Sequence, residues 1–234
     1  MDKLCIVIPA YNEAQNIERV VADWHPIVEQ YGEESKLIII DDGSKDDTFS
    51  LLKKCQKEYP LLYPTTKKNS GHGATVLYGY HYALEDGANF VFQTDADGQT
   101  LAEEFSAFWE LRNTYDMVIG NRCKREDGLS RVLVTKILKV VVLLCFGVVV
   151  EDANTPFRLM KSTTLKEQIG NVPKDFNLSN VLISVIYAKK KLDVKFLPIS
   201  FRQRQGGVNS INLLKISKIG MKAIRDFRMI KKSI

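Results

Sequence analysis

The chain has 234 residues, enough for one large α/β domain or two small ones with an extensive core. Hydrophobic residues make up 45% and charged residues 26% of it, with no low-complexity tract or internal repeat, which excludes intrinsic disorder and repeat architectures. The formal net charge of +5 is mild and gathers at the C-terminal end, where nine Lys or Arg and one acid lie between Arg202 and Ile234.

The first 120 residues alternate between strands and helices. Continuous apolar runs predict buried strands at Leu4–Pro9, Lys36–Ile40, Phe90–Thr94 and Met117–Gly120. Helical spacing of apolar residues predicts helices at Ala14–Tyr31, Asp47–Glu58, Ala74–Glu85 and Leu101–Arg112. This alternation predicts an α/β fold, a single Rossmann-like domain with a mostly parallel central sheet flanked by helices.

The second half of the chain is less regular. The predicted elements are a helix at Ser130–Val149, an irregular stretch at Glu151–Phe157, a helix at Asn177–Lys190, a strand at Val194–Phe201 and a basic amphipathic helix at Asn209–Lys232. No linker interrupts the pattern, so we expect one domain with a C-terminal helical extension.

Cysteine usage and apolar runs indicate the compartment. The four cysteines form no C-x-x-C pair and the three histidines have no zinc-like spacing, which favours free thiols in a reducing compartment. The apolar run Leu4–Ile8 is too short for a signal peptide, and the longest run, Val140–Val150, is too short to span a bilayer. We expect a cytoplasmic protein without a transmembrane span.

Four polar clusters each follow a predicted strand. They are Asn12–Glu13, Asp41–Asp42, Asp95–Asp97 and Asn121–Arg122. Because ligands of parallel sheets bind beyond the carboxyl ends of the strands, these clusters predict a single site at one edge of the sheet.

Asp95 and Asp97 lie two residues apart at a strand end, so an extended backbone points both carboxylates the same way. Two adjacent carboxylates repel each other unless a cation lies between them. Hard oxygen ligands suit Mg²⁺ or Mn²⁺, with a diphosphate completing the coordination. The alternative is a turn of solvated acids, since Asp and Gly are common turn residues.

Seven strings, in this order and spacing, resemble the family-2 glycosyltransferases of the GT-A fold, and especially the polyprenyl-phosphate or dolichyl-phosphate hexosyltransferases. They are IVIPAYNE (6–13), IIIDDGSKDDT (38–48), NSGHGAT (69–75), DADGQ (95–99), IGNR (119–122), DANTPFR (152–158) and SFRQRQGGVNS (200–210). The resemblance implies a GT-A domain over residues 1–205, with a nucleotide-sugar half at 1–122 and an acceptor half at 123–205. A basic helical extension would follow at 206–234.

The resemblance also assigns roles to residues. The nucleotide pocket would consist of Pro9, Ala10, Tyr11, Glu13, Asp42 and Asp95. Asp97 and Gln99, with Asp95, would hold the cation on the diphosphate. Arginine contacts to phosphates would come from Arg122 and Arg131 on the lipid-phosphate side and from Arg202 on the nucleotide side, since a guanidinium fork matches phosphate oxygens.

Three features of the sequence allow more than one interpretation. Asp152 matches an aspartate near the acceptor that has a catalytic role in some members, and its alternative is a helix cap or a brace for Arg158. Thr155–Pro156–Phe157 departs from the Ser or Cys followed by Gly that is common in the lipid-phosphate branch. Gly71 and Gly73 could cradle phosphate, but a structural turn is favoured.

These roles together predict an inverting, metal-dependent transfer of a hexose from a GDP-mannose or UDP-glucose type donor to a polyprenyl or dolichyl phosphate. The alternatives are a family-2 enzyme that adds sugar to a saccharide hydroxyl, and a nucleotide-sugar-binding module without turnover. We expect peripheral contact with an anionic membrane through Ile211–Lys232 and the Val140–Val150 run. Nucleic acid is not an expected partner, because the basic end lacks interleaved aromatic residues.

Overall fold

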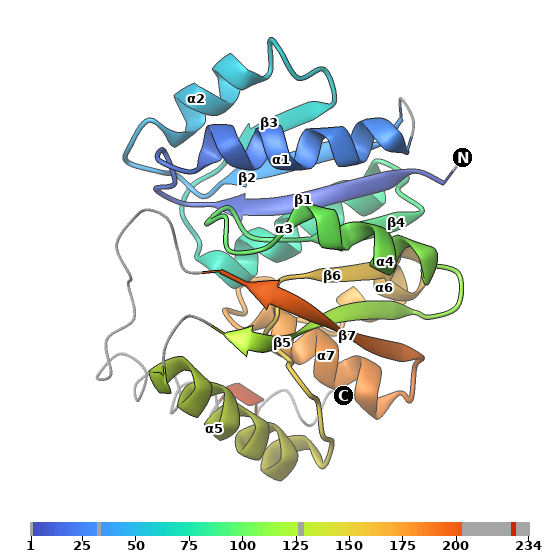
Figure 1. Cartoon of the computed structure of the whole chain (residues 1–234). Coiled ribbons are helices and arrows are strands. Elements are labelled where there is room, and N and C mark those ends of the chain that lie inside the picture. The colour runs from blue at the N-terminus through green and yellow to red at the C-terminus, as the bar shows by residue number, and fades with distance from the viewer. Residues whose placement is uncertain (1, 32–33, 126–128, 203–225, 228–234) are drawn as a thin grey trace.

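The computed structural model describes residues 2–31, 34–125, 129–202 and 226–227. For residues 123–125 and 129–134 it describes the backbone and not the side chains. A seven-stranded sheet, in the order β3-β2-β1-β4-β6-β5-β7, runs through the centre of the molecule (Figure 1). The strands are β1 (Leu4–Ala10), β2 (Lys36–Asp41), β3 (Leu62–Thr66), β4 (Phe90–Gln93), β5 (Met117–Arg125), β6 (Arg158–Lys161) and β7 (Val194–Phe201).

The sheet is parallel except at β6, which pairs antiparallel with both β4 and β5. The prediction of an α/β fold with a mostly parallel sheet is therefore confirmed. Strands β3 and β6 were not predicted. Strand β3 is a half-exposed edge strand that contains Pro64, and β6 is four residues long and begins with Arg158, so neither shows an apolar run.

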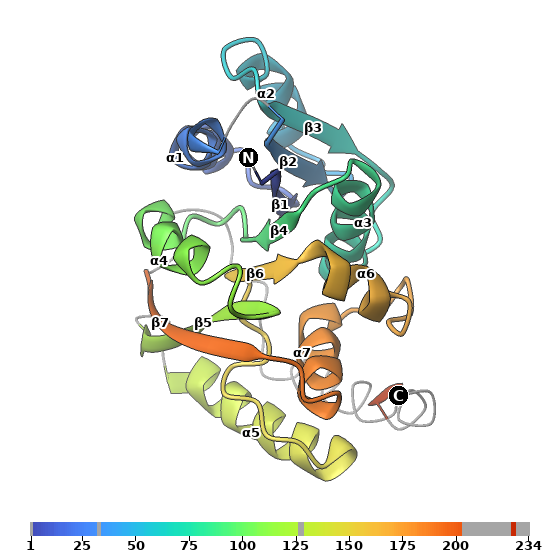
Figure 2. The ribbon, with the colours of Figure 1, turned by 90° about the vertical axis from the view of Figure 1, so that its right-hand side faces the viewer.

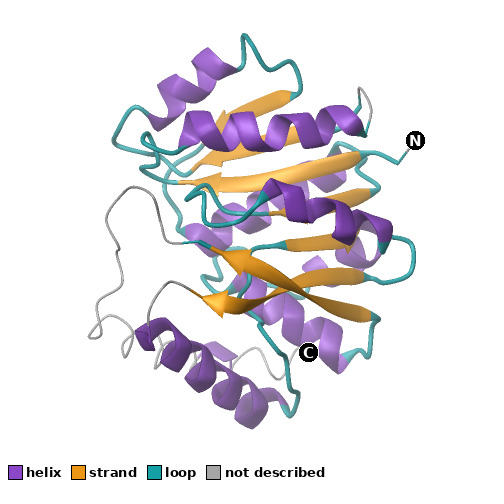
Figure 3. Cartoon of the chain, viewed as in Figure 1, coloured by secondary structure: helices purple, strands orange, loops and turns teal. Residues whose placement is uncertain are grey.

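Helices cover both faces of the sheet (Figures 2 and 3). They are α1 (Ile17–Gln30), α2 (Thr48–Cys55), α3 (His72–Glu85), α4 (Phe105–Glu110), α5 (Leu129–Phe146), α6 (Ser162–Ile169) and α7 (Ser179–Lys189). Side chains of a strand alternate between faces, so Ile6 and Ile8 pack in the core layer under α1 and α4, whereas Cys5 and Val7 pack in the layer under α3 and α7.

Several predicted elements have other bounds in the structure. The helix expected at Leu101–Arg112 is a 3-10 turn, Ala102–Glu104, followed by the short helix α4. The helix expected at Asn209–Lys232 lies outside the described residues apart from 226–227, where Phe227 packs on the rings of Phe146 and Phe176.

Cys5, Cys55 and Cys145 are buried free thiols, as expected for these three. Within the described part of the chain, no helix combines the length and the apolarity that crossing a bilayer requires.

A half-buried ion-pair cluster closes the amino-terminal edge of the sheet. Asp86, just after α3, accepts from Lys3 Nζ at 2.8 Å and from Lys36 Nζ at 2.5 Å, which ties α3 to the starts of β1 and β2. Burial alone would raise the pKa of Asp86, but the hydrogen bonds from the two lysines outweigh it and place this pKa below its ordinary value of 3.8.

We expect Asp86→Asn to lower the free energy of unfolding by about 1.5–3 kcal/mol at neutral pH, the usual contribution of hydrogen bonds to a charged group. Because the folded pKa lies below the unfolded one, this contribution is present above the unfolded pKa and is lost as the pH falls through the folded pKa. Urea denaturation at several pH values should therefore show that the free energies of unfolding of the native protein and the variant converge as the pH falls. Asp175→Asn, at an exposed position, is the control, and a pH-independent difference would contradict the prediction.

Candidate active site

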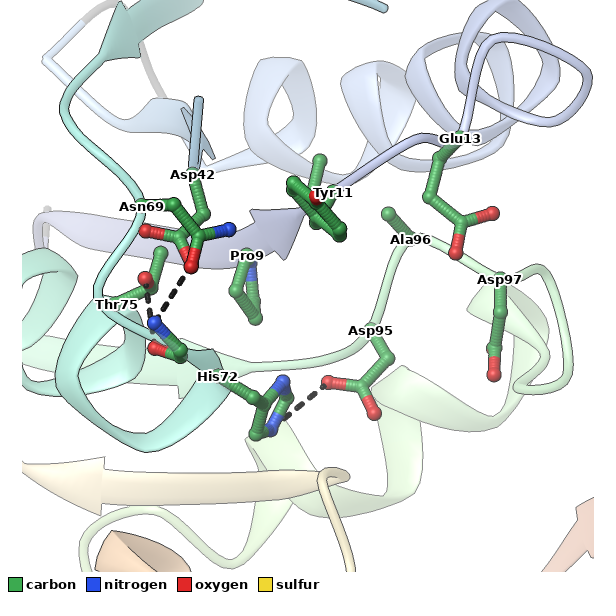
Figure 4. A pocket seen from close by; sticks show the side chains of 12 residues that line it. Pro9, Tyr11, Glu13, Asp42, Asn69, His72, Thr75, Asp95, Ala96 and Asp97 are labelled. Carbon is green, nitrogen blue, oxygen red and sulfur yellow. Dashed lines mark hydrogen bonds and ion pairs between the residues drawn. The ribbon is translucent and has the colours of Figure 1, made fainter. Parts of the chain in front are cut away.

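A pocket of about 370 Å³ lies at the carboxyl ends of β1, β2 and β4 (Figure 4). Its lining residues are Pro9, Ala10, Tyr11, Glu13, Asp42, Asn69, Gly71, His72, Thr75, Asp95, Ala96 and Asp97. Three of the four predicted polar clusters therefore meet in one pocket, as the strand-end positions indicated.

The segment after β1 forms one wall of the pocket. Asn12 adopts a positive φ of 55°, and its side-chain oxygen accepts from the Lys45 N–H at 2.8 Å. The N–H of Glu13 donates to Thr48 Oγ1 at 2.9 Å, which fixes this segment to the start of α2. Tyr11, 42% exposed, is thereby held with its ring at the mouth of the pocket.

Asp41 and Asp42 have different surroundings although they are neighbours in sequence. Asp41 accepts from Thr66 Oγ1 at 2.7 Å and from the Ser44 N–H at 3.2 Å, so it braces the turn that follows β2. Asp42 lines the pocket, and its backbone N–H donates to Ala10 O at 2.8 Å.

The carboxylate of Asp42 organises the loop before α3. It accepts from Lys67 Nζ and, at 2.9 Å each, from the N–H groups of Ser70 and Gly71. Burial would raise the pKa of Asp42, but the hydrogen bonds from Lys67, Ser70 and Thr75 outweigh it, and the pKa is lower than usual. Asp42 therefore stays ionised and holds the loop against the pocket.

Asp95 and Asp97 point into the other end of the pocket (Figure 4). Asp95 Oδ1 is buried without a hydrogen-bond partner among the described residues, and His72 Nε2 lies 3.8 Å from it. Asp97 Oδ1 accepts from the Gln99 N–H at 3.1 Å.

These carboxylates fit a divalent cation. A nearby positive charge stabilises a carboxylate oxygen that lacks a hydrogen-bond donor, and two carboxylates at one end of a pocket supply hard oxygen ligands. In the described part of the chain, no three His, Cys, Asp or Glu side chains are placed to hold a metal by themselves.

Gln99 and Arg202 lie beside the pocket and are absent from its lining. Gln99 is 2% exposed, its Nε2 donates to Arg202 O at 2.7 Å, and the Arg202 N–H donates back to Gln99 O at 2.9 Å. This double contact fastens the Asp95–Asp97 loop to the end of β7. The metal role predicted for Gln99 and the diphosphate role predicted for Arg202 stay predictions.

The fourth strand-end cluster forms a second group of charges. Arg122 Nε and Nη2 donate to the two carboxylate oxygens of Asp152 at 2.8 and 2.7 Å, and the guanidinium lies 5.1 Å from the centre of the Phe201 ring. Asp152 thus pairs with Arg122, while Arg158, its partner in the bracing alternative, donates to backbone carbonyls and to Ser184 Oγ. The side chain of Arg131, in the first turn of α5, lies outside the description.

Asn69, His72 and Thr75 also line the pocket, and the sequence did not assign them to it. They belong to the NSGHGAT string, in which Gly71 has a φ of 88° and α3 starts at His72. A polar Gly-rich string before a helix was the available signal.

The family model described as "Glycosyl transferase family 2" matches residues 5–168. An undecaprenyl-phosphate 4-deoxy-4-formamido-L-arabinose transferase of Pseudomonas syringae is 28% identical over 168 residues, which cover 70% of this chain and only 49% of that relative. A UDP-N-acetylglucosamine–dolichyl-phosphate N-acetylglucosaminyltransferase of Methanococcus voltae is 28% identical over 222 residues, 85% of each chain.

Among solved structures, glucosyl-3-phosphoglycerate synthase of Mycobacterium tuberculosis, in complex with Mn²⁺, UDP and phosphoglyceric acid, superposes with a TM-score of 0.71. It is 14% identical and the match covers 98% of this chain and 78% of that one, so it bears on the fold alone.

The fold is that of a GT-A glycosyltransferase. Because the family model matches more than half of its residues, the chain belongs to glycosyl transferase family 2. The expected family and enzyme class are confirmed.

Gly73→Ala should destabilise the start of α3. A Cβ at Gly73 would lie 2.2 Å from Phe176 O and 2.5 Å from the carbonyl carbon of Asn177, so two backbone segments would have to separate. We expect a loss of about 1–3 kcal/mol in the free energy of unfolding, the usual cost of overpacking. Gly170→Ala is the matched control, because a Cβ there meets nothing within 4 Å at a φ of −62°. Equal stability of the two variants would refute the close approach.

Proposed function

We propose that this protein transfers a hexose, with inversion, from a nucleotide-activated sugar of the GDP-mannose or UDP-glucose type to a polyprenyl or dolichyl phosphate. The observation that carries the proposal is the convergence of Asp42, Asp95 and Asp97 from two strand ends on one pocket. Both relatives reported above are named as transferases that act on undecaprenyl or dolichyl phosphate.

The nucleoside would occupy the end of the pocket formed by Pro9, Tyr11 and Asp42. Tyr11 offers an exposed ring face against which a base can stack. Asp42 orders the loop that carries Asn69 and Gly71, which places further polar groups beside the base and ribose.

The diphosphate would lie toward Asp95 and Asp97, where Mg²⁺ or Mn²⁺ would be held, with Gln99 and Arg202 beside them. The cation supplies charge neutralisation of the leaving diphosphate. The acidic pocket repels a bare diphosphate, so the carboxylates make donor binding depend on the cation. The acceptor phosphate would approach Arg122 and Arg131 and attack the anomeric carbon from the opposite face.

Asp97→Ala should reduce transfer to background while the protein stays folded, because loss of the leaving-group charge stabilisation costs several kcal/mol, or more than about 10³-fold in rate. The assay follows radiolabelled sugar from GDP-mannose or UDP-glucose into an organic-extractable, acid-labile product with farnesyl phosphate and Mn²⁺. Asp175→Asn, an exposed carboxylate change, serves as the control.

Full activity of Asp97→Ala, or of the native protein in EDTA, would remove the metal role. Transfer of the sugar to a saccharide, and not to the lipid phosphate, would refute the proposed acceptor and favour the saccharide alternative. No turnover with any donor, in a protein whose melting temperature rises with nucleotide sugar, would indicate a binding module.

We also propose that the protein meets a membrane surface through α5. This helix packs Val142 and Phe146 into the core, yet Ile137, Val140 and Leu144 are 52, 55 and 76% exposed. Exposed large apolar side chains in a row on one helix mark a surface that contacts another apolar phase. The helix also contains Arg131, so a lipid phosphate could reach the site from the same surface.

Lys136→Glu/Lys139→Glu should weaken co-sedimentation with anionic liposomes at low salt by roughly tenfold or more, because each cation near an anionic surface contributes about 1 kcal/mol. Lys53→Glu/Lys54→Glu makes the same charge change on α2, at the opposite end of the sheet (Figure 1), and should have a smaller effect. Leu144→Asp should weaken binding at any salt concentration. Equal binding of all variants would exclude α5 as the contact surface.

A further inference from the structure

We propose that Asp152 is the counter-ion that positions Arg122 for an anionic acceptor, and that it is not the base of the transfer reaction. The inference rests on the proposed function and assigns a distinct role to each member of the Arg122–Asp152–Phe201 group.

The guanidinium of Arg122 is held on one edge and on one face. Its Nε and Nη2 form a bidentate pair with the two oxygens of Asp152, and its Cζ lies over the Phe201 ring, 5.1 Å from the ring centre. The side chains of Arg122 and Asp152 are only 10% and 5% exposed, so the pair is shielded from solvent screening. Nη1 has no hydrogen-bond partner among the described residues, which leaves that edge to bind an anion.

Both oxygens of Asp152 accept charge-assisted hydrogen bonds from the same cation. A carboxylate in this state is a weak proton acceptor, because protonation would break the pair and leave the guanidinium uncompensated. A phosphate monoester has a second pKa of about 6, so it needs no base at neutral pH. A sugar hydroxyl would need one. The pairing therefore suits a phosphate acceptor.

A buried arginine fixes the backbone around Asp152. Arg158 is fully buried and donates to Ala153 O at 3.1 Å, to Thr155 O at 2.6 and 3.0 Å, and to Asn180 O on α7 at 3.0 Å. These contacts tie the 153–155 segment to α7 and hold Asp152 in register with β5, where the Gly120 N–H donates to Phe157 O at 2.7 Å.

The test compares native protein with Asp152→Asn and Arg122→Lys, using farnesyl phosphate as the acceptor probe. We expect Asp152→Asn to raise the KM for farnesyl phosphate roughly tenfold or more, with kcat within about threefold, since it loses a charged hydrogen-bond partner of Arg122. The Kd for nucleoside diphosphate with Mn²⁺ and the pH profile of kcat should be unchanged. Arg122→Lys, which lacks the planar fork, should act in the same direction, and the double variant should be no worse than Arg122→Lys alone.

Asp86→Asn is the matched control, a half-buried carboxylate paired with lysines at the other edge of the sheet, and it should lower stability without changing this KM. A fall in kcat of about 100-fold or more in Asp152→Asn, with loss of the acidic limb of the pH profile and an unchanged KM, would overturn the inference in favour of a base.

Calorimetry with farnesyl phosphate separates this inference from the proposed function, because it needs no turnover. The native protein could bind farnesyl phosphate and yet make no lipid product. If both substitutions then weaken that binding, the positioning role is supported and the proposed reaction is refuted. If Asp152→Asn and Arg122→Lys bind farnesyl phosphate as tightly as the native protein, or if the native protein does not bind it, the inference is overturned.

Discussion

The candidate active site depends on the hydrogen-bond ladder of β1. All seven residues of β1 are buried, and the strand is paired on both sides, with β2 and with β4. Both ladders continue past the ends of the neighbouring strands, since the Asp42 N–H donates to Ala10 O at 2.8 Å and the Thr94 N–H donates to Val7 O at 3.2 Å. A single strand therefore sets the separation between Asp42 and the Asp95 end of the pocket, and any slip in its register would move both carboxylate groups.

The antiparallel strand β6 links this pocket to the second charged group. It lies between β4, whose end leads to Asp95, and β5, which carries Arg122. The segment that leads into β6 carries Asp152. Because β6 runs antiparallel to β4 and β5, it begins at the edge of the sheet where those two strands end. Arg158 at the start of β6 is fully buried and donates to three backbone carbonyl groups, which is an alternative to the carboxylate partner that a buried arginine usually requires.

Sequence alone predicted the parts of the fold and site that follow from local pattern. The apolar runs of β1, β2 and β4 located the strand ends, and the rule for parallel sheets then brought Asp42, Asp95 and Asp97 together. The different roles of Asp41 and Asp42 could not be predicted, because they depend on whether Thr66 or the 67–71 loop donates to each carboxylate. The Arg122–Asp152 pair joins residues thirty positions apart, and no periodicity encodes such a contact.

The two charged groups differ in how their charge is balanced. The pocket gathers Glu13, Asp42, Asp95 and Asp97, and of these Asp42 is neutralised by Lys67 while Asp95 keeps a buried oxygen without a hydrogen-bond donor. On the proposed function, an anionic donor would enter such a pocket together with a cation. Arg122 instead has its charge balanced by Asp152 and still offers an open edge, so an anion can bind there without a metal and without a large change in net charge. On the proposed function, the pocket would bind a metal-bound diphosphate and the Arg122–Asp152 pair a bare phosphate, which would keep the leaving group and the nucleophile apart.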